Sequence, residues 1–87
     1  MNNLDQFKVW LQENKSFDNK KVYNDIISRI RRADRLCSIE NYCEENIDEY
    51  LFHLMKIDEV KGLSSSVRSQ LKRAVLLYKE YLSQNNQ

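Results

Sequence analysis

Proline is absent from this chain of 87 residues, and Gly62 is its only glycine. Tight hairpins depend on glycine, proline and similar residues at their turns, so a sheet would have few means of reversing direction. Leucine, lysine, glutamate, glutamine and arginine, which favour helices, are common instead. The sequence therefore predicts an all-α fold.

The length of the chain allows one compact domain, which we expect to cover residues 1–87. No apolar run approaches the roughly 20 residues that span a membrane, and the first residues lack the layout of a signal peptide. We therefore expect a cytoplasmic protein without membrane contact. Cys37 and Cys43 are too few for a disulfide framework, so both are expected to be free thiols.

Apolar residues recur every three or four positions in four stretches, which is the spacing of amphipathic helices. These stretches predict helices over residues 4–14, 18–37, 47–58 and 66–83, followed by a polar tail over 84–87. Ser16 or Asp18 is expected to cap the second helix, and one of the serines 64–66 the last. Gly62 is expected to close the third helix or the turn that follows it with a positive φ, which has no steric cost for glycine. Residues 38–45 show no period and predict a loop.

Charge is strongly segregated along the chain, although the net charge is only +1. Residues 15–35 hold seven bases and three acids, residues 40–59 seven acids and one base, and residues 61–79 five bases and no acid. On helical wheels, most bases of the second helix lie opposite its apolar stripe, and three bases of the last helix form one strip. Such faces suit a phosphate backbone, although many charged helix faces are simply solvated. The candidate phosphate contacts, expected to form one basic patch, are Lys20, Lys21, Arg31, Arg32, Arg35, Arg68, Lys72 and Lys79.

The segment Ser16-x-x-Asn19-x-x-x-Tyr23 resembles the Ser-x-x-Thr-x-x-x-Tyr start of the second helix in the N-terminal core-binding domain of tyrosine recombinases, the phage-integrase family. The opening Leu4-x-x-Phe7-x-x-Trp10-Leu11 resembles the first helix of that domain, and Ile47-Asp48-Glu49-Tyr50-Leu51 the start of its third. The segment from Ser65-Ser66-Val67 through Ala74-Val75-x-x-Tyr78-x-x-Tyr81-Leu82 resembles the last helix of that domain. Leu76 stands near a position where that family often has a basic residue.

The resemblance implies a four-helix, SAM-like orthogonal bundle whose second and fourth helices face the major groove of DNA. It implies a non-catalytic module that binds double-stranded DNA in recombination, either within a larger integrase-like protein or as a stand-alone relative. Phosphate contacts position a protein without reading sequence, so any base reading would fall to polar residues such as Asn19, Asn24 or Ser69.

Nothing in the sequence predicts catalysis or a metal site. His53, the only histidine, lies within a predicted amphipathic helix, and the spacing of Cys37, Cys43 and His53 does not fit a zinc site. We therefore expect no enzyme activity, cofactor or metal. Four of the five tyrosines fall on or beside apolar stripes, so we expect core packing rather than a stacking platform for bases.

A protein-interaction or regulatory module is the alternative hypothesis. In that hypothesis the acidic segment 40–59 would bind a protein partner or a further domain of a larger protein. Leu76 points nearly opposite the apolar stripe of the last helix, which makes it a candidate apolar contact. The candidate partner contacts are Glu44, Glu45, Glu49 and Leu76.

Overall fold

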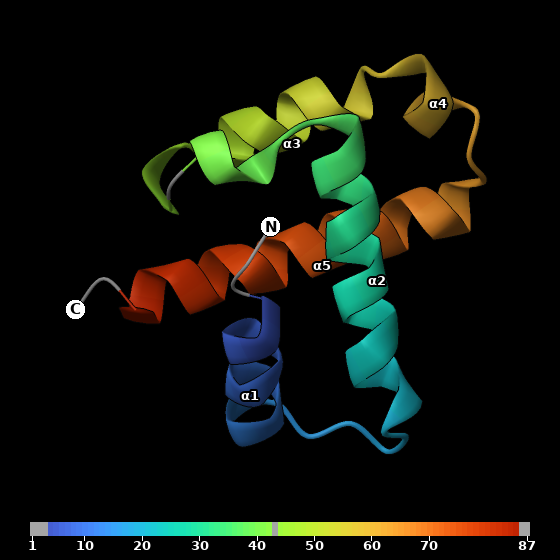
Figure 1. Ribbon diagram of the computed structural model, residues 1–87. Coiled ribbons are helices and arrows are strands. Elements are labelled where there is room, and N and C mark those ends of the chain that lie inside the picture. The colour runs from blue at the N-terminus through green and yellow to red at the C-terminus, as the bar shows by residue number, and fades with distance from the viewer. Residues whose placement is uncertain (1–3, 43, 86–87) are drawn as a thin grey trace.

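The computed structural model describes residues 4–42 and 44–85, which form helices and connecting turns without a β-strand (Figure 1). This confirms the all-α fold. The elements are α1 (Leu4–Asn14), α2 (Lys21–Leu36), the 3₁₀ helices η1 (Ile39–Asn41) and η2 (Glu44–Asn46), α3 (Ile47–Met55), α4 (Asp58–Lys61) and α5 (Ser65–Asn85).

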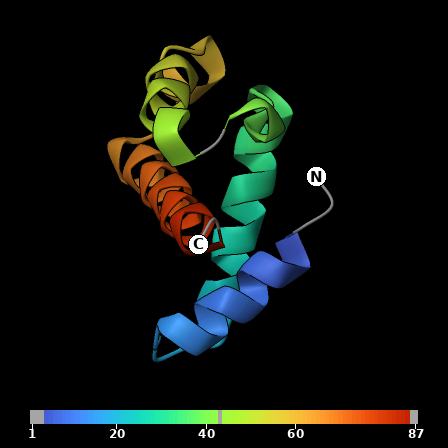
Figure 2. The same ribbon diagram turned by 90° about the vertical axis from the view of Figure 1, so that its left-hand side faces the viewer.

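The two longest helices, α2 and α5, cross near the middle of the molecule, and the other helices are arranged around this crossing (Figure 1). Helix α1 packs against both α2 and α5. Helix α3 runs alongside α5 (Figure 2). Residues buried in α1, α2, α3, α4 and α5 join in one apolar cluster. The crossing therefore fixes which faces of α2 and α5 can reach solvent.

Aromatic side chains of α1 and α5 make one end of this core. The ring centroid of Phe7 lies 5.2 Å from that of Tyr78 and 5.3 Å from that of Tyr81, and Trp10 lies 5.8 Å from Tyr81. Tyr50, Tyr78 and Tyr81 are all buried, which confirms core packing for these rings. Trp10 Nε1 donates a hydrogen bond of 2.7 Å to Gln84 Oε1, so the expected polar tail begins inside α5. Residues 86–87 of that tail lie outside the described residues.

The third predicted helix, over residues 47–58, is interrupted. Helix α3 ends at Met55, Ile57 takes an extended conformation, and α4 begins at Asp58. The core stripe of α3 ends at Leu54, and a continuous helix would turn Val60, six residues later, well away from it. The break allows Val60 to be fully buried. The interruption of the helix thus coincides with the entry of Val60 into the core.

The second predicted helix, over residues 18–37, begins later, at Lys21. Neither Ser16 nor Asp18 caps it. Instead Asn19 Oδ1 accepts a hydrogen bond of 2.9 Å from the Lys21 amide, and the Asn19 carbonyl accepts one of 3.0 Å from the Val22 amide. The later start leaves the preceding residues in an irregular turn.

The segment expected to be a loop, residues 38–45, contains η1 and the start of η2. Ile39 is buried, and its amide donates a hydrogen bond of 3.0 Å to Asp34 Oδ1. Tyr50 of α3 donates its hydroxyl to the Cys37 carbonyl at 2.7 Å, which ties the end of α2 to α3. The segment is thus anchored despite having no periodic pattern.

Gly62 does not have the expected positive φ: it ends α4 with φ −76° and ψ −11°, in the ordinary helical region. The turn that follows needs no left-handed residue. Ser64 Oγ accepts a hydrogen bond of 3.2 Å from the Val67 amide and so caps α5, one of the three serines expected there. Helix α5 begins at Ser65 and extends to Asn85, beyond the predicted range of 66–83.

Candidate nucleic-acid interface

The outward face of α2 carries a group of exposed cations. Lys21, Arg32 and Arg35 follow one another at nearly whole numbers of helical turns, so they share the side of α2 that faces away from the core. Arg31 is exposed on a neighbouring strip, and Lys20 is exposed just before the helix. Within residues 4–42 and 44–85, none of these five cations forms an ion pair. Their charge is therefore available to an external anion.

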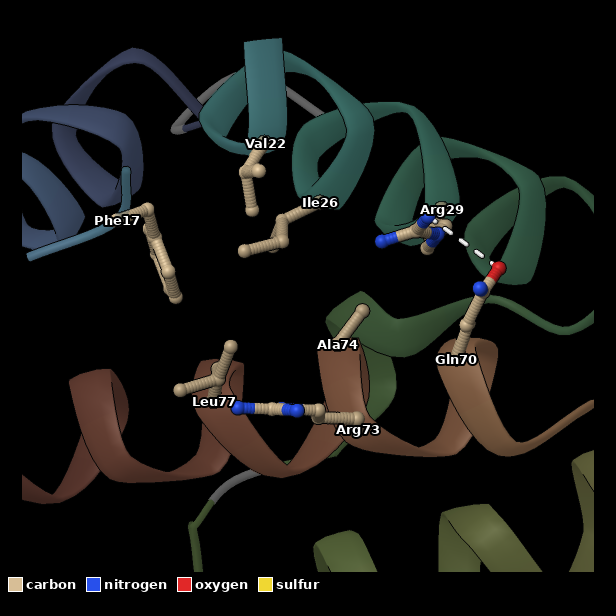
Figure 3. A pocket seen from close by; sticks show the side chains of 8 residues that line it. All are labelled: Phe17, Val22, Ile26, Arg29, Gln70, Arg73, Ala74 and Leu77. Carbon is tan, nitrogen blue, oxygen red and sulfur yellow. Dashed lines mark hydrogen bonds between the residues drawn. The ribbon is translucent and has the colours of Figure 1, made fainter. Parts of the chain in front are cut away.

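A groove of about 240 Å³ lies where α2 and α5 cross, and we call it the crossing groove. Figure 3 shows that apolar side chains from both helices and from the preceding turn make its floor, while two arginines and a glutamine provide its polar groups. Arg29 donates a hydrogen bond of 3.3 Å to Gln70 Oε1 across the two helices. The lining residues are Phe17, Val22, Ile26, Arg29, Gln70, Arg73, Ala74 and Leu77.

The crossing groove joins the outward face of α2 through Arg29. A second hollow on α2 is lined by Arg29 and Arg32 together with Asp25 and Ser28. Arg73, Arg29 and Arg32 therefore line a continuous surface that passes from α5 to α2. Among the described residues none of these three guanidinium groups forms an ion pair, although Asp25 lies nearby.

Sequence reasoning missed Arg29 and Arg73. Both lie at the edge of an apolar stripe rather than on the outward face, Arg29 beside Ile26 and Arg73 beside Ala74. A helical wheel shows this edge position, but it does not say which helix packs against that edge. The sequence therefore indicates that Arg29 and Arg73 lie at the edge of an apolar stripe, but it does not indicate that the two residues face the same groove.

The cations predicted on α5 lie on the other side of that helix, next to α3. Lys79 Nζ is 3.1 Å from Asp48 Oδ2 of α3. Arg68 and Lys72 line a hollow of about 300 Å³ that also includes Met55 at the end of α3. The expected single patch is thus divided between the α2 side and the α3 side of the molecule.

The acidic candidates lie around the start of α3. Glu45 and Glu49 are exposed, and Glu49 Oε1 is 3.8 Å from His53 Nε2 one turn later. Glu44 belongs to η2, and its side chain lies outside the described part of the structure. Leu76 is 40% exposed on α5 and lines a hollow beside α3.

The site offers charge and hydrogen bonds. Within residues 4–42 and 44–85, no group of three or more histidine, cysteine, aspartate or glutamate side chains is arranged to hold a metal ion. Cys37 is a half-buried free thiol, and Cys43 lies outside the described residues. In the same ranges no helix is both long enough and apolar enough to cross a membrane. Arginine and lysine side chains supply most of the charged groups on this surface.

Comparison of the chain with protein-family models, with curated proteins and with solved structures finds no match. The resemblance to recombinase core-binding domains therefore depends on the sequence motifs alone.

Proposed function

We propose that this chain binds double-stranded DNA through the cations of α2 and the adjoining edge of α5. One observation carries the proposal: Arg29 and Arg32 of α2 and Arg73 of α5 line a continuous surface, and no carboxylate in the described residues forms an ion pair with them. Guanidinium groups bind phosphate oxygens through paired N–H donors, so such a surface suits a phosphate backbone.

The exposed cations of α2 extend this surface along the helix. Lys21 and Arg35 lie on the same outward side as Arg32, so a backbone following α2 would meet several positive charges in turn. Helix α5 contributes Arg73 to this interface, while Arg68, Lys72 and Lys79 border α3. The resemblance to recombinase core-binding domains, in which two of four helices face DNA, favours duplex DNA over other polyanions. A SAM-like arrangement of the four longer helices is part of this proposal.

Base reading, where it occurs, falls to polar side chains on the same side of α2. The Asn19 carboxamide oxygen already accepts a hydrogen bond from the Lys21 amide. Asn24 is exposed and its side chain makes no hydrogen bond within the described residues, so it is the better candidate.

The test is fluorescence anisotropy of a labelled duplex titrated with the protein at several salt concentrations. The double variant Arg32→Gln/Arg73→Gln removes two charges from the surface, and Lys56→Gln/Lys61→Gln removes two charges from the end of α3 and from α4 as a matched control. Each lost phosphate contact makes the slope of log affinity against log salt shallower by about 0.9, so we expect a change of about 1.8 in the double variant. The control variant should keep the slope of the unmodified chain.

Two results would contradict the proposal. The first is an absence of duplex binding at low salt, and the second is an equal change of slope in both double variants. The variant Glu45→Lys/Glu49→Lys distinguishes DNA binding from the alternative of a protein-interaction module that uses the acidic segment 40–59. This variant should bind DNA at least as tightly as the unmodified chain if the DNA contacts lie on α2, whereas lost DNA binding would place contacts near α3.

A further inference from the structure

A second groove lies between α3 and α5, away from the cations of α2, and we call it the α3–α5 groove. Its volume is about 480 Å³, and its floor is formed by Leu51, Phe52 and Met55 of α3 and Leu76 of α5. Phe52 is 59% exposed and Leu76 is 40% exposed. Among the described residues, the one other large apolar side chain so exposed is Val9, on α1. Two exposed large apolar groups thus share one shallow, open hollow, which is typical of a binding site for a protein segment.

The side chains of this groove suit an apolar partner. Phe52 contributes an aromatic ring to the floor, and Lys56 places its Nζ 4.0 Å from the centroid of that ring. Met55 is half-buried at the end of the groove, and methionine adapts its flexible side chain to differently shaped partners. The Phe52 ring and the Lys56 ammonium group are thus both exposed to a partner, beside the apolar side chains of the groove.

Most of the charged side chains that line the groove are cations. Lys56 and Lys72 border it, and the adjoining hollow, which shares Met55 and Lys72, adds Arg68. Arg68 Nε is buried and has no hydrogen-bond partner among the described residues. Asp48, the one carboxylate among the described residues that line the groove, is already paired with Lys79 at 3.1 Å. A bound segment would therefore meet an apolar floor with unpaired cations along its edge.

We propose that the α3–α5 groove binds an amphipathic helix of a partner protein, with apolar residues at three- and four-residue spacing and acidic residues beside them. The apolar side chains of the partner would cover Phe52, Met55 and Leu76, as in helix-in-groove recognition. Its carboxylates would pair with Lys56, Lys72 and Arg68, which sets the sign of the charge that the partner carries. The residues of this groove are separate from the cations proposed to contact DNA on α2, so either proposal can fail alone.

The test uses the full ¹⁵N-labelled chain and two synthetic helical peptides that share one pattern of leucines. One peptide has glutamate at the positions beside the leucines, and the other has lysine there. We expect the glutamate peptide to shift amide resonances of α3 and α5 around Phe52 and Leu76, and the lysine peptide to bind at least tenfold more weakly.

Leu76→Glu places a carboxylate on the floor of the groove and should weaken binding of the glutamate peptide at least tenfold. Val9→Glu, a matched change at the exposed apolar residue of α1, should leave binding unchanged. Phe52→Glu serves as a second groove variant if Leu76→Glu fails to fold, as judged by circular dichroism. Equal binding of the two peptides, or resonance shifts that map to Arg29 and Arg73, would overturn the proposal. A dimer of the chain that Leu76→Glu dissociates in sedimentation would also overturn it, because the occupant would then be a second copy.

Discussion

The hydroxyl of Tyr50 offers a sharp test of how the end of α2 is held. The Tyr50 side chain is fully buried, and its hydroxyl donates to the Cys37 carbonyl at 2.7 Å. Tyr50→Phe removes this donor and keeps the ring, including its edge contact with Tyr42 at 5.0 Å between centroids. The variant therefore isolates one hydrogen bond from the packing around it.

The expected cost is about 2 kcal/mol of unfolding free energy, since a hydrogen bond is lost and a partly buried backbone carbonyl loses its partner. A domain of this size is expected to have a total stability of about 4–13 kcal/mol, so the loss is a large fraction. At about 4–8 °C per kcal/mol, the melting temperature should fall by about 8–16 °C.

Urea denaturation followed by circular dichroism measures the change directly. Tyr81→Phe is the matched control, because Tyr81 is also buried but its hydroxyl makes no hydrogen bond within the described residues. The control should change the unfolding free energy by less than about 0.5 kcal/mol. If both variants lose equally little, the bond between Tyr50 and Cys37 does not hold α2 to α3 in solution, and the reasoning is refuted.

Three further predictions follow from the same structure. Gly62→Ala should raise the unfolding free energy measured in urea by about 0.4–1 kcal/mol. Gly62 has helical backbone angles, and an added Cβ would lie 3.6 Å from the nearest atom, the Asp58 carbonyl oxygen, so alanine fits without strain. A lower unfolding free energy would show that the turn needs glycine. Ser64→Ala should lower the unfolding free energy by about 1 kcal/mol, and with it the melting temperature, because the Val67 amide loses its cap. The control Ser66→Ala should change the melting temperature little. Burial raises the pKa of Tyr78 to about 12, with Tyr81 as a smaller cause, and burial also raises the pKa of Tyr50. Since these folded-state pKa values exceed the unfolded value near 10, stability should be complete below pH 10 and fall as the pH rises towards 12; a constant urea midpoint from pH 9 to 11.5 would contradict this.

The sequence was most informative where one helix could be considered alone. Apolar spacing predicted four amphipathic segments because each buries a stripe against the core. It did not predict the break at Ile57, because that break depends on where the pocket for Val60 lies in the folded molecule. The burial of Ile39 was missed for the same reason, since an isolated apolar residue in a polar stretch has no period.

The candidate interface was predicted less well than the fold. A wheel gives the direction of each cation about its own helix axis, and it placed Arg32 and Arg35 outward on α2 as the structure has them. It could not place Arg68, Lys72 and Lys79 beside α3, since that depends on the order in which helices pack around α5. Contacts between helices distant in sequence decide which cations share a surface.

The net charge of +1 says little about how this chain meets a polyanion, because the charges are separated in space as well as in sequence. The molecule measures 34 × 29 × 19 Å, whereas the screening length is about 8 Å at physiological salt and about 30 Å at 0.01 M. At physiological salt the acids around α3 are therefore largely screened from a phosphate bound on α2, and local cations decide the affinity. At 0.01 M the same acids act across the whole molecule and oppose binding. The gain in DNA affinity from Glu45→Lys/Glu49→Lys should accordingly be larger at 0.01 M than at physiological salt, and an equal gain at both would mean that these acids lie within direct reach of the DNA.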